Sequence, residues 1–268
     1  MAQPAAPVRL YVSVTGRSGI SIGDLTQSAF HLSVDGHDQP IETFAAGAEP
    51  GSVGLVIQGS LSTKDNSPAV GAAVKALVGA LAPRAEVFAM GFNDKTTLYA
   101  NWTTNPEAIS RGLQRMEFRG GSAVLDGIHS AVAYMDRTAA QQHRVVVAIT
   151  NGDDNASGKS LSDVISLAQR ADIAVYSFVV KKNSVTDKKS RSQQEEITKK
   201  TGGRMFYAAK ASEWEQQVPA AAGIMRSYYV IGFTPASAGS SVHRIRVTLP
   251  SNPDAVVSAR ESCFESAC

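Results

Sequence analysis

Hydrophobic and polar positions follow two different patterns along the chain. In residues 8–48 and 235–268, apolar and polar residues alternate with a period of two, which is typical of half-exposed β-strands. In residues 52–234, short apolar runs alternate with stretches of helical periodicity, which indicates strands joined by helices in a largely parallel sheet. The sequence therefore predicts an α/β domain between two β segments.

The two β segments need a covering layer, because one face of each expected strand is apolar. The expected strands are Val8–Val14, Phe30–Val34, Gln39–Phe44, His243–Leu249 and Ala255–Arg260. Asp35-Gly36, between the second and third of these, is a hairpin signal. The simplest architecture joins residues 8–48 and 235–268 into one small sheet or sandwich and leaves residues 1–7 as a disordered or added tail.

The α/β segment opens with the apolar run Val53–Ile57, which is too short for a helix and reads as a strand buried on both faces. Ala85–Phe92 and Thr96–Trp102 are joined by so short a polar turn that they must be antiparallel neighbours. We therefore expect a doubly wound, mostly parallel sheet with one antiparallel edge strand and helices on both faces.

Further strands are expected at Arg144–Thr150, Ile173–Val180, Met205–Ala208 and Tyr228–Phe233. Helices are expected at Pro68–Leu81, Asn105–Met116, Leu161–Arg170, Glu195–Thr201 and Ser212–Ser227, with one more that Ser122 caps and that runs to about Thr138. The Lys- and Ser-rich stretch Lys181–Arg191 is expected to be a mobile loop.

The composition excludes several classes of function. The hydrophobic share of 43% and the charged share of 19% are ordinary for a globular protein, and the net charge of +2 gives no case for nucleic acid or an anionic membrane surface. No apolar run approaches the ~20 residues of a membrane span. The only cysteines, Cys263 and Cys268, are too few for a metal site and fit either a disulfide or two free thiols.

Motifs of catalysis and nucleotide binding are missing. Asp153–Ser160 follows a strand and precedes a helix, as a P-loop does, but Asp153 stands where that motif begins with Gly, and its carboxylate would repel phosphate. The sequence has no Gly-x-Gly-x-x-Gly and no Gly-x-Ser-x-Gly, and none of its histidines follows a predicted strand at its carboxyl end. We expect no enzymatic activity.

Three polar turns remain as candidate chemistry. They are Gln58-Gly59-Ser60-Leu61-Ser62, Gly120-Gly121-Ser122 and Thr150-Asn151-Gly152-Asp153. A parallel sheet would bring them to its carboxyl edge, which is where open α/β sheets bind their ligands. The expected site residues are Gln58, Ser60, Ser62, Ser122, Asn151 and Asp153.

In these turns the chain resembles a von Willebrand factor type A domain, and more narrowly the acidobacterial family related to it. The Asp-x-Ser-x-Ser of that fold aligns with residues 58–62, its Gly-Gly-Thr with residues 120–122, and its Thr-Asp-Gly-x-Asp-Asn with residues 150–155. The resemblance spans nearly the whole chain. It implies a protein-interaction domain, and with the Ala/Pro/Gln-rich start of the chain it implies a secreted or periplasmic bacterial protein.

In most such domains these residues form a metal-ion-dependent adhesion site, where carboxylates and hydroxyls bind Mg²⁺ and the partner supplies a further carboxylate. This sequence departs from the pattern because both core carboxylates are replaced by amides, Gln58 and Asn151. We expect no tightly bound Mg²⁺ and no other cofactor. Asp65, Asp153 and Asp154 could still hold a cation loosely at the surface.

The expected function is a non-enzymatic module that binds a partner protein through the carboxyl edge of the sheet without a tightly bound metal. Two alternatives stay open. One is a scaffold protein with an inactive adhesion site and contacts through the β module, in which the serines only cap helices and close turns. The other is an adhesin that depends on a divalent cation. The sequence does not identify the partner or the oligomeric state.

Overall fold

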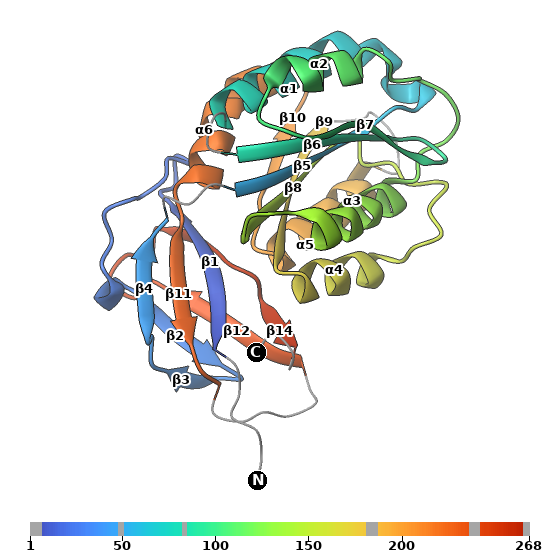
Figure 1. Cartoon of the computed structure of the whole chain (residues 1–268). Coiled ribbons are helices and arrows are strands. Elements are labelled where there is room, and N and C mark those ends of the chain that lie inside the picture. Colours follow the sequence, from blue (N-terminus) through green and yellow to red (C-terminus); the bar gives the residue numbers. More distant parts are fainter. Residues whose placement is uncertain (1–6, 48–50, 82–84, 181–186, 236–241, 265–268) are drawn as a thin grey trace.

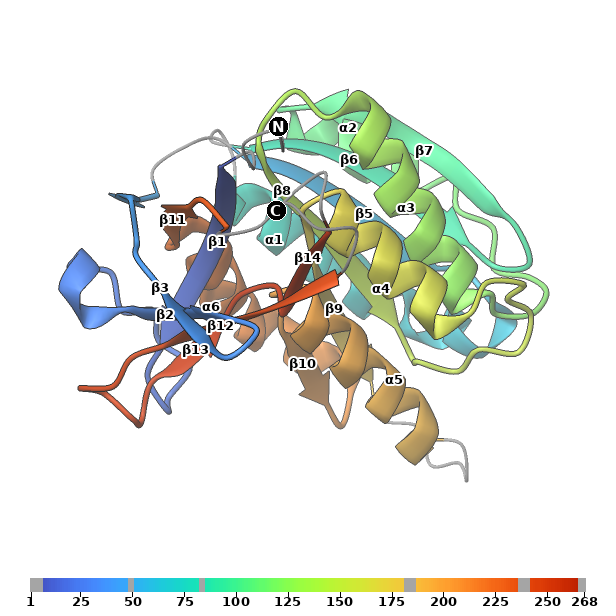
Figure 2. The same cartoon turned by 90° about the horizontal axis from the view of Figure 1, so that it is seen from below.

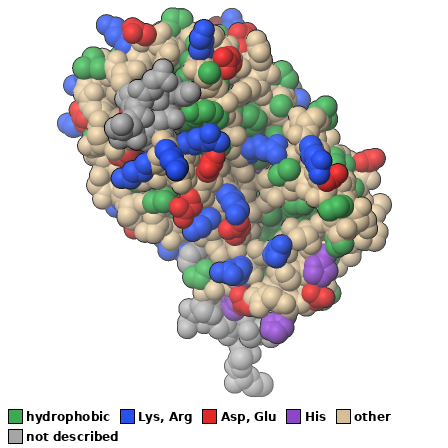
Figure 3. All heavy atoms as spheres, turned by 180° about the vertical axis from the view of Figure 1, so that it is seen from behind, with side chains coloured by type: hydrophobic (Ala, Val, Ile, Leu, Met, Phe, Trp, Pro, Cys, Tyr) green, Lys and Arg blue, Asp and Glu red, His purple; other side chains and the backbone are tan. Residues whose placement is uncertain are grey.

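The chain forms an α/β domain next to a smaller β-sandwich (Figure 1). A computed structural model describes residues 7–47, 51–81, 85–180, 187–235 and 242–264. None of the helices in these ranges is long and apolar enough to cross a membrane. On the face drawn in Figure 3, Lys and Arg side chains lie among Asp and Glu side chains, so that face carries mixed charge.

The central sheet has six strands in the order β10-β9-β8-β5-β6-β7. Their bounds are β5 Gly51–Gln58, β6 Ala85–Phe92, β7 Thr96–Thr103, β8 His143–Thr150, β9 Ile173–Val180 and β10 Met205–Ala208. β7 pairs antiparallel with β6, and all other pairs are parallel, as predicted. Every residue of β5 is buried, which explains why its sequence is apolar without alternation.

Helices cover both faces of this sheet (Figure 1). One face carries α1 (Ser67–Leu81), α2 (Pro106–Leu113) and α6 (Trp214–Arg226), and the other carries α3 (Val124–Thr138), α4 (Leu161–Arg170) and α5 (Asp187–Lys200). Each face of the sheet has its own apolar core, and alternate residues of β5 point into the two cores. Leu55 packs in the core beneath α1, α2 and α6, and Val56 packs in the core beneath α3, α4 and α5. The predicted doubly wound α/β fold is confirmed.

The remaining strands form two four-stranded sheets that face each other over a shared apolar core, so the predicted module is a sandwich. One sheet has the order β13-β1-β11-β4 and the other β14-β12-β2-β3. Their bounds are β1 Val8–Thr15, β2 His31–Val34, β3 His37–Gln39, β4 Thr43–Ala46, β11 Tyr229–Phe233, β12 Val242–Thr248, β13 Val256–Ser258 and β14 Ser262–Phe264. Asp35 and Gly36 both adopt positive φ, as a two-residue hairpin turn requires.

Two features of the sandwich differ from the prediction. β11 pairs antiparallel with β1 and β4, so this strand belongs to the sandwich and not to the α/β segment 52–234 in which we placed it. The return strand expected at Gln39–Phe44 is divided into β3 and β4, which lie in different sheets. Pro40 stands at the division, and because it has no N–H it cannot continue a strand ladder.

The predicted loop Lys181–Arg191 is also only partly right. Residues 187–191 belong to α5, while residues 181–186 lie outside the described part of the chain. The pattern did not indicate the start of α5 because the buried face of this helix is largely polar. Gln194 is buried and accepts a hydrogen bond of 2.8 Å from Ser177. Ile197 is the one fully buried apolar residue described in this helix.

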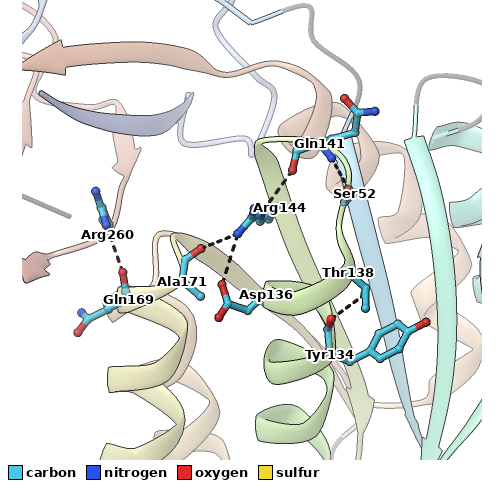
Figure 4. A network of polar contacts seen from close by, with 9 residues as sticks. All are labelled: Ser52, Tyr134, Asp136, Thr138, Gln141, Arg144, Gln169, Ala171 and Arg260. Atoms are coloured by element: carbon cyan, nitrogen blue, oxygen red, sulfur yellow. Dashed lines mark hydrogen bonds and ion pairs between the residues drawn. The ribbon is translucent and has the colours of Figure 1, made fainter. Parts of the chain in front are cut away.

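Buried polar contacts join the sandwich to the α/β domain (Figure 4). The Arg260 guanidinium donates to the Gln169 carbonyl (3.1 Å) and the Arg9 carbonyl (3.2 Å), and it pairs with Asp172 at 3.4 Å. Nearby, Arg144 donates to the carbonyl of Ala171 at 3.4 Å. The contacts of Arg260 with Gln169 and Asp172 fix the end of α4 against the sandwich, and the Arg144 bond holds that end of α4 to β8.

Candidate functional site

The ends of β5 and β8 place the first and third polar turns side by side. The two strands are parallel neighbours, so Gln58 at the end of β5 lies next to Thr150 and Asn151. The Gln58 side-chain oxygen accepts hydrogen bonds from the Thr150 hydroxyl (2.6 Å) and the Asn151 backbone N–H (2.9 Å). Gln58, Ser60 and Asn151 are buried, whereas Ser62 is exposed.

The two amides and two hydroxyls form a closed circuit of hydrogen bonds, which we call the amide circuit: Gln58, Ser60, Ser62 and Asn151. The Gln58 amide nitrogen donates to Ser60 Oγ (2.8 Å), Ser60 Oγ and Ser62 Oγ are 3.0 Å apart, and the Asn151 amide nitrogen donates to Ser62 Oγ (3.1 Å). The bond from the Asn151 N–H to the Gln58 oxygen closes the circuit.

Backbone donors fix the direction of both amides. The Asn151 N–H can only donate, so the atom of Gln58 that faces it must be oxygen, and the –NH₂ group is then turned to Ser60. In the same way the Asp153 N–H donates to Asn151 Oδ1 (3.1 Å), which turns the Asn151 –NH₂ group toward Ser62. Each amide therefore presents hydrogen atoms to the serine hydroxyls.

This arrangement does not fit a divalent cation. Mg²⁺ needs converging oxygen ligands, and here –NH₂ groups face the hydroxyls that would have to turn toward the metal. Asp153 accepts from Ser190 of α5 (3.1 Å), and Asp65 is exposed on the 3-10 helix Leu61–Asn66. Among the described residues, no three His, Cys, Asp or Glu side chains gather as a metal site would require.

Asp154 caps the N-terminus of α3. Its carboxylate accepts from the backbone N–H groups of Leu125 (2.9 Å) and Ser157 (3.1 Å), so it provides an acceptor and a negative charge at the N-terminus of that helix. Our prediction that Ser122 caps this helix is therefore wrong. The helix begins at Val124, and the cap comes from the neighbouring turn.

Ser122 lies outside the amide circuit. Its N–H donates to Asn155 Oδ1 (2.8 Å), and its carbonyl accepts from the Asn155 N–H (2.9 Å), which ties the second polar turn to the third. Its hydroxyl is buried and has no hydrogen-bond partner among the described residues. A buried hydroxyl without a partner costs about 1–3 kcal/mol. Ser122 is thus the polar group of the site whose hydrogen-bonding capacity is least used.

Leu61 is a feature of this edge that our residue prediction missed. It stands between Ser60 and Ser62 and is 64% exposed. The signal was present in the sequence, as a large apolar residue inside a polar turn, but the pattern alone did not say that it points to solvent. Leu61 is therefore the apolar side chain at this edge that a bound partner would contact.

The cysteines are not part of this edge. Cys263 is buried in the core of the sandwich and is not a free thiol. Cys268 lies outside the described residues, so a disulfide between the two stays a prediction.

Comparison with known proteins agrees with this geometry. The model of the von Willebrand factor type A domain matches residues 52–220. No curated protein matches the chain in sequence.

The solved structures that resemble the chain share its fold at low identity. A von Willebrand factor type A protein from Catenulispora acidiphila is 9% identical at a TM-score of 0.56, over 98% of this chain and 75% of that one. Proximal thread matrix protein 1 from the mussel byssus, with zinc in its adhesion-site motif, is 14% identical at a TM-score of 0.57, over 71% and 49%. The pilus adhesin SpaC from Lactobacillus rhamnosus GG is 12% identical at a TM-score of 0.54, over 87% and 46%.

The chain therefore spans about half the length of the mussel protein and of the pilus adhesin. Domains with this fold are generally protein-interaction or adhesion modules. Because the family model covers more than half of the residues and the sheet has the strand order described above, the chain belongs to the von Willebrand factor type A domain family.

Proposed function

We propose that the chain is a non-enzymatic protein-interaction module that binds a partner protein at the carboxyl edge of the central sheet without a tightly bound metal. The observation that carries this proposal is the amide circuit, in which the groups that correspond to metal ligands bond to one another. Replacing two carboxylates by amides removes two negative charges, a loss on the order of several kcal/mol for a divalent cation.

The partner would meet a surface that is already ordered. Leu61 offers an apolar contact, and the exposed hydroxyl of Ser62 can bond a polar group of the partner. Because the amide circuit holds the turn around Leu61 in place, little conformational entropy is lost when a partner binds. Such binding would persist when divalent cations are removed.

Calorimetric titration with Mg²⁺, Mn²⁺ and Ca²⁺ tests the metal part of this proposal. We expect no binding to the wild-type chain and clear binding to the Gln58→Asp/Asn151→Asp double variant. A matched Gln58→Glu/Asn151→Gln variant keeps the number of changes but adds only one charge, so it should bind more weakly than the double aspartate. Micromolar binding to the wild type would refute the charge argument and favour a cation-dependent adhesin.

Photo-cross-linking tests the location of the binding surface. A benzophenone amino acid placed at Leu61 should form a cross-link to the partner in the source cells, and the yield should not change when EDTA is added. The same group at Val256, which is 42% exposed on the sandwich, is the control. Cross-links at Val256 alone would favour a scaffold role with contacts through the β module.

We also propose that the protein acts outside the cytoplasm, in the periplasm or after secretion. The adhesin SpaC, a pilus protein, shares the fold. Fractionation of the source cells with an antibody to the chain is the test, and recovery in the cytoplasmic fraction alone would contradict the assignment.

A further inference from the structure

The third polar turn contains the sequence Asn151-Gly152, the one place in the chain where a glycine follows an asparagine. An asparagine side chain can react with the backbone nitrogen of the next residue, because attack of that nitrogen on Cγ closes a five-membered ring. A glycine in the second position has no Cβ to hinder this approach. The pair follows β8, which lies beside β5 in the central sheet (Figure 2), so the reactive asparagine belongs to the carboxyl edge.

The fold holds the Asn151 side chain against its own backbone. The Asp153 N–H donates to Asn151 Oδ1 at 3.1 Å, and this bond closes a ring of atoms that contains both Asn151 Cγ and the Gly152 nitrogen. The same N–H stabilises the negative charge that develops on Oδ1 when Cγ is attacked. This donor therefore both positions and activates the carboxamide.

The attacking nitrogen is also held in place. The Gly152 N–H donates to Thr150 Oγ1 at 2.8 Å, while the Thr150 hydroxyl donates to Gln58 Oε1 at 2.6 Å. Gly152 has a φ of +80°, a left-handed conformation that glycine adopts without strain. Thr150 is thus a positioning residue, because its hydroxyl fixes the direction of the Gly152 N–H.

The leaving group lies next to solvent. The Asn151 –NH₂ group donates to Ser62 Oγ at 3.1 Å, and Ser62 is exposed. Asn151 itself is only 4% exposed. Its burial does not hinder the closure of the ring, since that step uses no water, and ammonia can leave on the side of Ser62.

We propose that Asn151 is a self-modification site at which the side-chain amide is converted into a carboxylate with water as the only co-reactant. First the Gly152 nitrogen bonds to Asn151 Cγ, the Cγ–Nδ2 bond breaks, and the proton of the Gly152 N–H leaves with the –NH₂ group as ammonia. Then water adds to one carbonyl carbon of the ring, the bond from that carbon to the Gly152 nitrogen breaks, and the nitrogen takes up a proton. Addition at the side-chain carbonyl gives aspartate, and addition at the main-chain carbonyl gives isoaspartate.

The conversion changes the chemistry of the carboxyl edge with the age of the molecule. A carboxylate has no N–H to donate to Ser62, so the amide circuit opens at that bond, and the edge gains one negative charge. New and converted chains therefore present different surfaces to a partner. This inference goes beyond the proposed function and does not rest on it, since the reaction takes place in the chain without a partner.

Peptide mapping by mass spectrometry, on the whole chain incubated at mildly alkaline pH and sampled over weeks, measures the conversion. A synthetic peptide with the sequence of residues 147–156 is the comparison. Because the fold positions both reacting groups, Asn151 should convert in the folded chain at least as fast as in the peptide, and faster than the other asparagines of the chain. Conversion in the peptide but not in the folded chain would overturn the proposal and show that the fold protects this amide.

Two variants test the positioning by Thr150. Thr150→Val removes the hydroxyl but keeps the size of the side chain, and it should slow the conversion in the folded chain by on the order of tenfold or more. Thr150→Ser keeps the hydroxyl, is the matched control, and should convert at the wild-type rate. The same changes in the peptide should have no effect, and equal rates for folded wild type and Thr150→Val would contradict the positioning role. Circular dichroism confirms that each variant is folded, and the comparison of the wild type with the peptide decides the proposal if the Val variant is not.

Discussion

His143 should make the protein sensitive to mild acid. It is the first residue of β8 and is buried where the α/β domain meets the sandwich. Its ring centroid lies 3.9 Å from that of Tyr228 and 5.0 Å from that of Tyr11 of β1. Burial lowers the pKa of His143 to about 4, because this apolar and aromatic setting disfavours the charged imidazolium.

The direction and size of the effect follow from linkage. An imidazole in the unfolded chain has a pKa of 6.5, so it takes up a proton in the unfolded state before it does so in the folded state. The stability contributed by neutral His143 is therefore fully present above pH ~6.5 and is lost as the pH falls toward about 4. The loss amounts to about 2 kcal/mol at pH ~5 and about 3 kcal/mol at pH ~4.

Urea unfolding measured by circular dichroism between pH 7.5 and 4.5 is the assay. Carboxylates also titrate in this window, so the informative quantity is the difference between the wild type and a His143→Phe variant, which keeps an aromatic ring but cannot be protonated. We expect the free energy of unfolding of the wild type to fall more steeply with pH than that of the variant. A His143→Gln variant provides the same comparison if Phe does not fit. Parallel pH curves for all three proteins would refute the reasoning.

Three other substitutions have defined outcomes. Arg260→Met should remove the hydrogen bonds that the buried guanidinium donates to the carbonyls of Gln169 and Arg9 and its ion pair with the half-buried Asp172, and it should lower the free energy of unfolding by about 2 kcal/mol, which urea denaturation measures; a change under about 0.5 kcal/mol would contradict the anchoring role. Gly203→Ala should destabilise by about 3 kcal/mol or more, because its Cβ would lie 1.9 Å from the Val175 carbonyl oxygen; a well-expressed variant with an unchanged melting temperature would contradict this contact. Gly71→Ala should stabilise by about 1 kcal/mol, since nothing lies within 4 Å of the added methyl group inside α1; a lower melting temperature would show that this glycine has a packing role.

Much of the fold could be predicted because local pattern and burial agree in the α/β domain. The apolar runs that became β5, β8 and β9 have no polar face, and α4 and β9 begin and end at the predicted residues. The sequence did not show which sheet β11 would join, because a short apolar strand looks the same whether its neighbours are parallel or antiparallel. α5 was underestimated because polar side chains fill much of its buried face.

For the candidate site at the carboxyl edge, the sequence predicted which residues lie close together but not how their side chains are oriented. Adjacent parallel strands end at one edge, so Gln58 and Asn151 had to be neighbours. The direction of their amides depends on backbone N–H groups whose positions exist only in the fold, and the same is true of the exposure of Leu61.

The pairing of Gly47 with Tyr228 has a consequence for how the molecule bears mechanical load. The Gly47 N–H donates to the Tyr228 carbonyl at 2.6 Å, so the chain enters and leaves the α/β domain at one point. The α/β domain is thus an insertion in the sandwich, between β4 and β11, which are themselves hydrogen-bonded neighbours. A tensile force applied at the start of β1 and at the end of β14 would act on the strands of the sandwich and not on the inserted α/β domain. The carboxyl edge of the inserted domain would keep its shape under tension for as long as β1 stays paired with β11.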